Sequence, residues 1–255
     1  MSTALIGHTG FVGQNLASQR AFGDCFNSRN ISSICGRSYD LVVCCGVRAE
    51  KWKANQEPAA DWAGIQALIE CLQTVEAQQF ILISTVDIYA APVDVDEDSP
   101  PDLERATPYG RHRYWLEQWV EERFPTLTVR LPGLFGPGLK KNVVYDLVHG
   151  HCLEQIHSDA RYQFYGLEHV WRDIETARRA GLRRINIATE PVSVEEVARG
   201  VFGLEFRQAP HDRPARYDFR SRHAAIYGGN GGYLYTKAAV LDCMRQFVCD
   251  HRGQG

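Results

Sequence analysis

The sequence lacks the features that mark membrane, secreted and nucleic-acid-binding proteins. It has no run near the about 18 consecutive apolar residues of a membrane-spanning helix, so we expect no membrane partner. The N-terminus has no basic segment followed by a long apolar stretch, which predicts a strand rather than a signal peptide and favours a cytoplasmic location. The formal net charge of −3 supplies no basic field, so we expect no nucleic-acid partner.

The cysteines and histidines also lack the spacing of a disulfide framework or a metal site. None of the eight cysteines forms a C-x-x-C pair. Cys44 and Cys45 lie in an apolar run, where cysteine acts as a small hydrophobic residue. The nine histidines form no cluster with cysteine at ligand spacing. We therefore predict reduced thiols and no bound metal.

Short apolar runs alternate with helix-like segments along much of the chain. The expected strands are 3–6, 41–45, 80–84, 127–131 and 184–188, and the expected helices are 13–20, 62–77, 109–124, 142–151 and 193–202. The last helix starts with Ser193 and Glu196 at the spacing of a capping box. This alternation predicts an α/β fold, a doubly wound parallel sheet with helices on both faces.

The chain divides into two predicted parts. Residues 1–135, with a strand and a helix from about 184–202, form the expected dinucleotide-binding domain, and residues 136–255 form a small mixed substrate-binding portion. Residues 31–40 leave space for little more than one helical turn and a linker. The strand that usually follows there is therefore expected to be missing or very short.

A glycine-rich loop follows the first predicted strand and opens a helix. It reads G-x-x-G-x-x-G, and glycine is needed where the turn has unusual dihedrals and the backbone approaches a diphosphate closely. The helix N-terminus adds free N–H groups and a partial positive charge. The alternative is a purely structural tight turn. The predicted dinucleotide contacts in this loop are Gly7, Thr9, Gly10, Phe11, Val12 and Gly13.

The end of the next strand lacks the acid that usually accepts hydrogen bonds from the adenosine ribose. Residues 25–30 read Cys-Phe-Asn-Ser-Arg-Asn. Arg29 can pair with a 2′-phosphate, with Ser28 beside it. The segment favours NADP over NAD, and a solvated surface arginine is the alternative.

Four motifs carry a resemblance to a known family: GHTGFVG, FILISTVDIY, TPYGRHRYWLE and VRLPGLFGPG, in this order. Over about residues 3–200 the chain resembles an extended short-chain dehydrogenase/reductase of the nucleotide-sugar epimerase/dehydratase type. The resemblance implies a Rossmann fold, a nicotinamide cofactor, a sugar-nucleotide substrate and a homodimer formed through helices 62–77 and 109–124.

By this resemblance Thr85 orients the substrate oxygen and Tyr109 exchanges a proton with it. A tyrosine needs a nearby cation to act at neutral pH, and the family lysine one helical turn later is here Arg113. Arginine keeps a charge and donors for the nicotinamide ribose but does not readily release a proton. We expect an active enzyme with altered kinetics. A relocated acid/base, or a protein that binds the dinucleotide without turnover, are the alternatives.

The resemblance also implies further contacts. The further cofactor contacts are Cys45, Gly46, Tyr109, Arg113, Leu131 and Pro132, and the substrate contacts are Asp87, Gly133, Lys141 and Asn142. Dehydratases of the family carry an acidic pair after the threonine, where this chain has Val86 and Asp87, so water elimination is disfavoured. Asp87 as a simple cap and Lys141 as a solvated side chain remain open.

Together these features predict an NADP-dependent reductase of a keto-sugar nucleotide or a related activated sugar. The alternatives are an NAD-dependent sugar-nucleotide epimerase and a dinucleotide-binding protein without turnover.

Overall fold

A computed structural model describes residues 1–210 and 213–252. The chain separates into two compact units. The first unit comprises Met1–Ala90, Ser99–Arg130 and Val170–Ile185, and the second unit comprises the rest. Each unit is described by itself.

A six-stranded sheet forms the centre of the first unit, in the order β2-β1-β3-β4-β5-β9. Its strands are β1 (Thr3–Ile6), β2 (Asp24–Phe26), β3 (Ser38–Cys44), β4 (Glu76–Thr85), β5 (Thr126–Leu131) and β9 (Arg184–Asn186). β1 pairs in parallel with both β2 and β3, so that Ala4 lies between Asp24 and Val42. β3 also pairs in parallel with β4.

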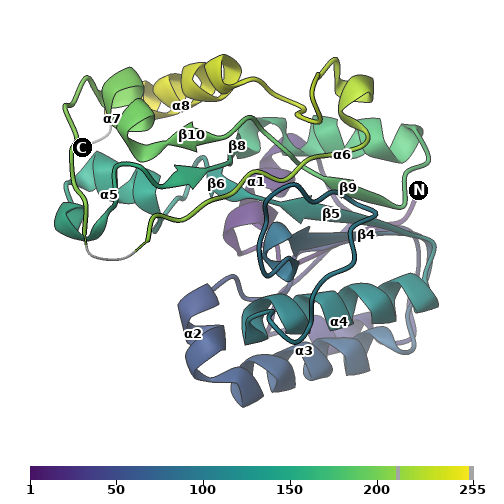
Figure 1. Ribbon diagram of the computed structural model, residues 1–255. Helices are drawn as coiled ribbons and strands as arrows, with labels where there is room; N and C mark the ends of the chain where they lie inside the picture. The colour runs from purple at the N-terminus through teal and green to yellow at the C-terminus, as the bar shows by residue number, and fades with distance from the viewer. Residues whose placement is uncertain (211–212, 253–255) are drawn as a thin grey trace. The chain divides into compact units, whose positions relative to one another are not determined.

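Helices cover both faces of this sheet (Figure 1). α1 (Phe11–Gln19) and α6 (Val170–Arg179) pack together on one face. α3 (Pro58–Leu72) and α4 (Pro108–Arg123) lie on the other, with the short α2 (Lys51–Gln56) against both of them. The predicted doubly wound α/β sheet is therefore confirmed.

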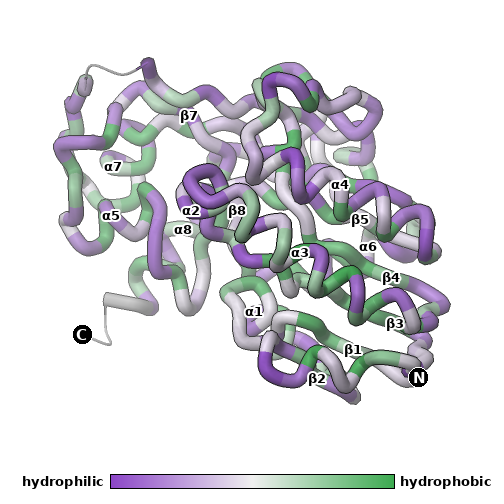
Figure 2. The backbone as a smooth tube through the Cα atoms, turned by 90° about the horizontal axis from the view of Figure 1, so that it is seen from below, coloured by the Kyte–Doolittle hydropathy of each residue, from purple (hydrophilic) through white to green (hydrophobic). Residues whose placement is uncertain are grey.

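The core of the first unit lies between the sheet and helices α3 and α4. Val42, Phe80 and Leu72 are fully buried there. Figure 2 shows the hydrophobic colour concentrated along β1, β3 and β4. These strands are apolar because both of their faces are covered, the usual reason for continuous hydrophobic runs in parallel sheets.

The link between β2 and β3 agrees with the sequence prediction. In the described chain it holds a single 3-10 turn, Ile31–Ile34, and no strand. The sheet therefore ends at β2, on the side where another strand was expected to be missing.

Some element boundaries were predicted wrongly. The helix predicted over 62–77 ends at Leu72, and β4 already begins at Glu76. Val75 continues the apolar helical spacing, but the Glu76 N–H donates to the Arg37 carbonyl beside β3 and joins the sheet. Helices α2, α6 and α8 (Lys237–Arg252) were not predicted.

The second unit contains two small sheets, in which β10 pairs with β7 and β6 pairs with β8. Their strands are β6 (Gly133–Phe135), β7 (Arg161–Tyr162), β8 (Phe164–Gly166) and β10 (Val192–Ser193). The helices are α5 (Val143–His149), α7 (Val194–Phe202) and α8. Single 3-10 turns occupy Val86–Ile88 (η2, in the first unit), Leu153–Gln155 (η3), Leu167–His169 (η4) and Ala224–Tyr227 (η5).

A helix cap and a buried carboxylate stabilise the second unit. Ser193 and Glu196 form the predicted capping box of α7 in both directions. Glu97, a buried carboxylate, accepts hydrogen bonds from the Asn186 N–H (2.8 Å), the Ser221 hydroxyl (2.6 Å) and the Arg222 N–H (2.9 Å). Glu97 thus ties its own segment to two other stretches of chain, one at Asn186 and one at Ser221 and Arg222. Among the helices of the described residues, none combines the length and apolar character needed to cross a bilayer.

Candidate active site

The glycine loop joins β1 to α1 through unusually close backbone contacts. Gly7 has φ +87°, and a Cβ there would lie 2.5 Å from the Cys45 carbonyl oxygen. A Cβ on Gly13 would lie 2.1 Å from the Gly7 oxygen. Side chains at these two positions would push the helix away from the strands. Glycine is therefore required for the tight turn that brings the start of α1 to the sheet edge.

The start of α1 is suited to an anion. Gly10 is its N-cap, and no side chain caps the first turn. Thr9 and Gly10 are exposed, whereas Phe11 and Val12 are half-buried. N–H groups of an uncapped first turn need an outside acceptor. The residues present thus fit the diphosphate of a dinucleotide, and Cys45 and Gly46 at the end of β3 lie against the same loop.

The end of β2 carries no acid in residues 27–30. Its turn is held by asparagines: the Asn27 N–H donates to Asn30 Oδ1 (2.7 Å) and the Arg29 N–H donates to Asn27 Oδ1 (2.9 Å). Ser28 and Arg29 are exposed. Asp24, at the start of the strand, accepts from Arg37 and Tyr39 instead. The turn is therefore well ordered and has no acid. The preference for NADP stays a prediction.

Thr85 and Tyr109 meet where β4 ends and α4 begins. Thr107 and Pro108 start α4 as N-cap and first helical residue. A Cβ on Gly110 would lie 2.0 Å from the Asp87 carbonyl oxygen, so only glycine allows α4 to dock there. The Thr85 side chain lowers the pKa of the buried Tyr109 phenol.

Several groups act on the pKa of Tyr109. Burial raises it and is the largest effect. The charge of Arg113 lowers it, that of Asp87 raises it, and that of Lys51 lowers it. The net direction is upward from the ordinary value. In the cofactor-free protein Tyr109 is therefore a protonated phenol at neutral pH, the form that can donate a proton.

Arg113 is buried and fully engaged. Its Nη1 donates to Asp61 Oδ2 (2.6 Å) and the Tyr109 carbonyl (3.2 Å), and its Nη2 donates to Asp61 Oδ1 (2.8 Å) and the Arg48 carbonyl (2.6 Å). Its guanidinium carbon lies 3.9 Å from the centre of the Tyr109 ring. The four terminal N–H bonds thus all have acceptors within the chain.

Asp61 is the residue that holds this arginine in place. Burial alone would raise its pKa, but hydrogen bonds from Arg113 and His112 outweigh that effect and the pKa lies below the usual range. The predicted contact of Arg113 with the nicotinamide ribose stays a prediction. It would require these donors to leave a buried carboxylate.

The family model for the NAD dependent epimerase/dehydratase family matches residues 18–178, more than half of the chain. The chain belongs to this family. The predicted resemblance, and with it a nicotinamide-dependent enzyme of the oxidoreductase and epimerase type, is thereby confirmed. The choice between NAD and NADP is finer than the family and is not decided by it.

Several solved structures share the fold of this chain. RMD from Pseudomonas aeruginosa complexed with NADPH is 16% identical, with a TM-score of 0.76 and 100% of both chains covered. A dTDP-4-dehydrorhamnose reductase from Bacillus anthracis in complex with NADP is 17% identical, with a TM-score of 0.76 and coverage of 98% of this chain and 99% of that one. The UDP-glucose 4-epimerase of Thermotoga maritima with UDP-glucose is 16% identical, with a TM-score of 0.72 and coverage of 100% and 99%. No curated protein matches the chain.

Sequence reasoning missed one charged residue at the site of this family member. Lys51, the first residue of α2, places its Nζ 2.8 Å from Asp87 Oδ1. The same helix supplies Asn55, whose Oδ1 accepts the Tyr109 N–H at 3.0 Å. No motif marks Lys51, because it stands in a short helix that periodicity does not reveal.

Among the site residues predicted in the second unit, Asn142 has a clear structural role. Asn142 caps α5 by accepting from the Val144 and Tyr145 N–H groups (3.0 and 3.1 Å) and donates to the Leu134 carbonyl (2.7 Å). Lys141 and Gly133 are exposed, Pro132 is half-buried and Leu131 is buried. The cofactor role of Leu131 and Pro132 and the substrate role of Gly133, Lys141 and Asn142 stay predictions.

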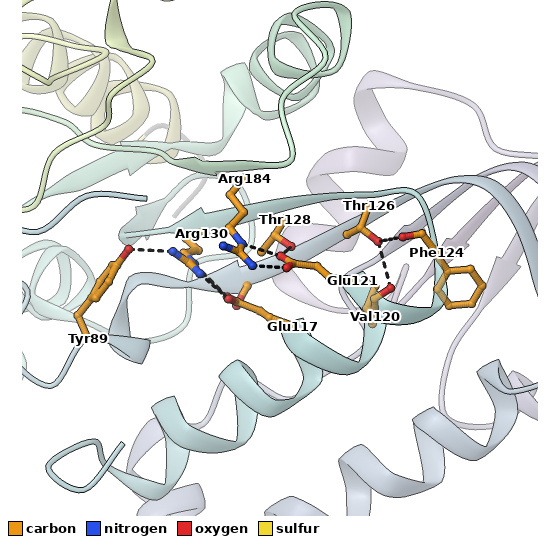
Figure 3. A network of polar contacts seen from close by, with 10 residues as sticks. Tyr89, Glu117, Val120, Glu121, Phe124, Thr126, Thr128, Arg130 and Arg184 are labelled. Carbon is orange, nitrogen blue, oxygen red and sulfur yellow. Dashed lines mark hydrogen bonds and ion pairs between the residues drawn. The ribbon is translucent and has the colours of Figure 1, made fainter. Parts of the chain in front are cut away.

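A buried ion-pair network joins Arg130 of β5 to Glu117 of α4 (Figure 3). Arg130 donates to Glu117 through Nη2 (2.7 Å) and Nε (3.2 Å), and to the Tyr89 hydroxyl (2.8 Å). The Ser84 hydroxyl donates to the same carboxylate at 2.5 Å. The pair therefore links β5, α4 and the residue before Thr85.

One group in the second unit brings together three residue types that can bind metals: Glu168, His169 and Cys243 lie with ligand atoms within 4.8 Å. The sequence could not show it, because the cysteine stands far along the chain. Burial and the hydrogen bond to Glu168 raise the pKa of Cys243 to about 12, so the thiol keeps its proton. Within the cluster, Glu168 is in contact with both Cys243 and His169, so its polar groups are partners of one another.

Proposed function

We propose that the protein is an NADP-dependent reductase that converts the keto group of a sugar nucleotide or related activated sugar to an alcohol. The observation that carries the proposal is the meeting of β4 and α4, where Gly110 seats α4 against Asp87 and the buried phenol of Tyr109 is influenced by the Thr85 hydroxyl. A hydroxyl and a phenol that lie side by side can both donate hydrogen bonds to one carbonyl oxygen.

Each part of the first unit has a task in this reaction. The glycine loop and the start of α1 hold the cofactor diphosphate, and Arg29 with Ser28 contacts the 2′-phosphate. Bound NADPH supplies the hydride. Thr85 orients the carbonyl oxygen and Tyr109 protonates it, while Asp87 contacts the sugar. The sugar nucleotide is further bound by Gly133, Lys141 and Asn142.

Reduction fits these residues better than dehydration. Val86 is 2% exposed and packs in the core, so the position next to Thr85 offers no acid for a leaving hydroxyl. The acid-free end of β2 supports NADP, and two of the similar structures contain NADPH or NADP.

Turnover of a keto sugar tests the proposal. We expect the protein to oxidise NADPH, followed by its absorbance, when dTDP-4-dehydrorhamnose or another keto-sugar nucleotide is added. Absence of oxidation across a panel of such substrates would leave a dinucleotide-binding protein without turnover, the alternative that Arg113 raises.

An NAD-dependent epimerase is the second candidate, since a similar fold carries that activity in the Thermotoga maritima enzyme. An epimerase must keep its NAD between turnovers. The nicotinamide bands of the purified protein distinguish the two, because a retained oxidised cofactor favours the epimerase.

Replacing Arg29 with alanine should weaken NADPH binding by roughly 10- to 100-fold and leave NADH binding unchanged, because one charge-assisted contact to the 2′-phosphate is lost. Titration calorimetry with both cofactors measures this. Arg37→Ala is the matched control, since that guanidinium is already paired with Asp24 at 3.1 Å. Equal losses for NADPH and NADH would refute the NADP assignment.

We also propose that the protein forms a homodimer through α3 and α4. The rings of Trp62 and Trp115 pack edge to face, with 5.1 Å between their centroids. Trp115 is 39% exposed. They line a groove together with Gln66, Ile69, Glu70, Gln73 and Trp119. Exposed aromatic clusters of this kind mark protein contacts.

Trp115→Glu should convert this dimer to monomers, because a charge would be buried at its centre. Light scattering coupled to gel filtration gives the mass. Trp52→Glu, which changes the more exposed tryptophan of α2, should remain dimeric. A monomeric parent protein would rule the dimer out.

A further inference from the structure

Proton donation by Tyr109 leaves an anion in a buried position. Such an anion needs a neighbouring cation and then a proton from a group in contact with solvent. The charged and polar groups that act on the phenol are Arg113 from α4, Lys51 from α2, Asp87 from η2 and Thr85 from β4. Two of them are cations, so the question is which one returns the proton.

Arg113 cannot fill this role. Its terminal N–H bonds are taken by Asp61, Arg48 and Tyr109 itself, and its side chain is 5% exposed. A guanidinium also keeps its proton in proteins. Arg113 therefore acts as a fixed charge over the tyrosine ring.

Lys51 has the properties that Arg113 lacks. An ammonium group can release a proton, and the Lys51 side chain is 43% exposed, so solvent can replace it. Its partner Asp87 donates its own N–H to Thr85 Oγ1 at 3.1 Å, and Thr85 contacts the tyrosine. Asn55 fastens the same helix to the Tyr109 backbone.

We propose that Lys51 is the positioning residue that supplies the titratable charge for Tyr109 and returns its proton after each turnover. The inference rests on the proposed reductase function. The substrate oxygen takes the phenol proton as the hydride arrives. The resulting phenolate then takes a proton from the Lys51 ammonium, and the neutral amine regains one from water.

Asp87 makes the contribution of Lys51 larger. Its charge raises the pKa of Tyr109, while Lys51 lowers it and neutralises the carboxylate. Without Lys51 the aspartate would be unopposed and the pKa of Tyr109 would rise. A weaker acid donates its proton more slowly, so the rate falls and the alkaline limb of the pH profile moves to higher pH.

Two substitutions separate charge from proton supply. Lys51→Met should lower kcat roughly 100-fold with little change in KM and raise the pKa of Tyr109. Lys51→Arg should keep the pKa of Tyr109 but still lose most of kcat, because arginine does not release a proton. Lys53→Met, two residues further along the same helix, should change neither.

The pKa of Tyr109 is read in the cofactor-free protein by NMR of ¹³C-labelled tyrosine, with the signal assigned through Tyr109→Phe. An unchanged tyrosine pKa in Lys51→Met, or parental kcat in Lys51→Arg, overturns the inference. If the parent protein oxidises no NADPH, the proposed function fails, and the NMR result still decides whether Lys51 controls Tyr109.

Discussion

Replacing Tyr109 with phenylalanine should lower kcat by about 10²- to 10⁴-fold, the usual contribution of a positioned acid. The ring is buried beneath the Arg113 guanidinium, 3.9 Å from its carbon, so phenylalanine keeps the packing and removes only the hydroxyl. Affinity for NADPH should change little, because we propose that most of the cofactor's binding energy comes from its diphosphate at the glycine loop. Single-turnover NADPH oxidation and cofactor titration measure the two quantities.

Tyr114→Phe is the matched control for this variant. Tyr114 is a half-buried tyrosine on the same helix, five residues along. It should retain the parental rate. Parental turnover in Tyr109→Phe would mean that another group donates the proton.

Arg130→Met should destabilise the protein by about 3–5 kcal/mol, the usual cost of removing one partner from a buried ion pair. Glu117 is 0% exposed and accepts from Arg130 and Ser84, so the change would leave a carboxylate in the core with one neutral donor. Methionine fills most of the volume of the lost side chain, which limits the effect of a cavity. Urea unfolding followed by circular dichroism measures the loss.

The double variant Arg130→Met with Glu117→Leu tests the cause. Removing both charges should recover much of the stability, because no unpaired carboxylate remains. A double variant as unstable as the sum of the two single changes would show that packing, and not charge, explains the loss.

Local signals in the sequence were sufficient for much of the fold. Leu41–Cys44 and Phe80–Leu82 are continuous apolar runs, and such runs mark strands covered on both faces. Ser193 and Glu196 fix the start of α7 through contacts between residues three apart. Gly7 and Gly13 signal a close approach of backbones that the structure shows directly.

The residues that the sequence did not reveal depend on contacts between distant segments. Arg113 is held by Asp61, which lies 52 residues earlier, and Lys51 reaches Asp87 from 36 residues away. No periodicity links such pairs, since only the folded sheet brings α2, η2 and α4 together. For the same reason the sequence showed Arg113 at the position of the family lysine but did not show that Lys51 lies nearby.

Hydride transfer from labelled cofactor distinguishes a reductase from an epimerase. NADPH carrying deuterium at C4 of the nicotinamide, prepared in both stereochemical forms, is incubated with the protein and dTDP-4-dehydrorhamnose. We expect one form to place its deuterium on the reduced sugar carbon, which mass spectrometry detects. A sugar product without deuterium from either form, together with interconversion of UDP-glucose and its 4-epimer, would contradict the reductase and establish an epimerase.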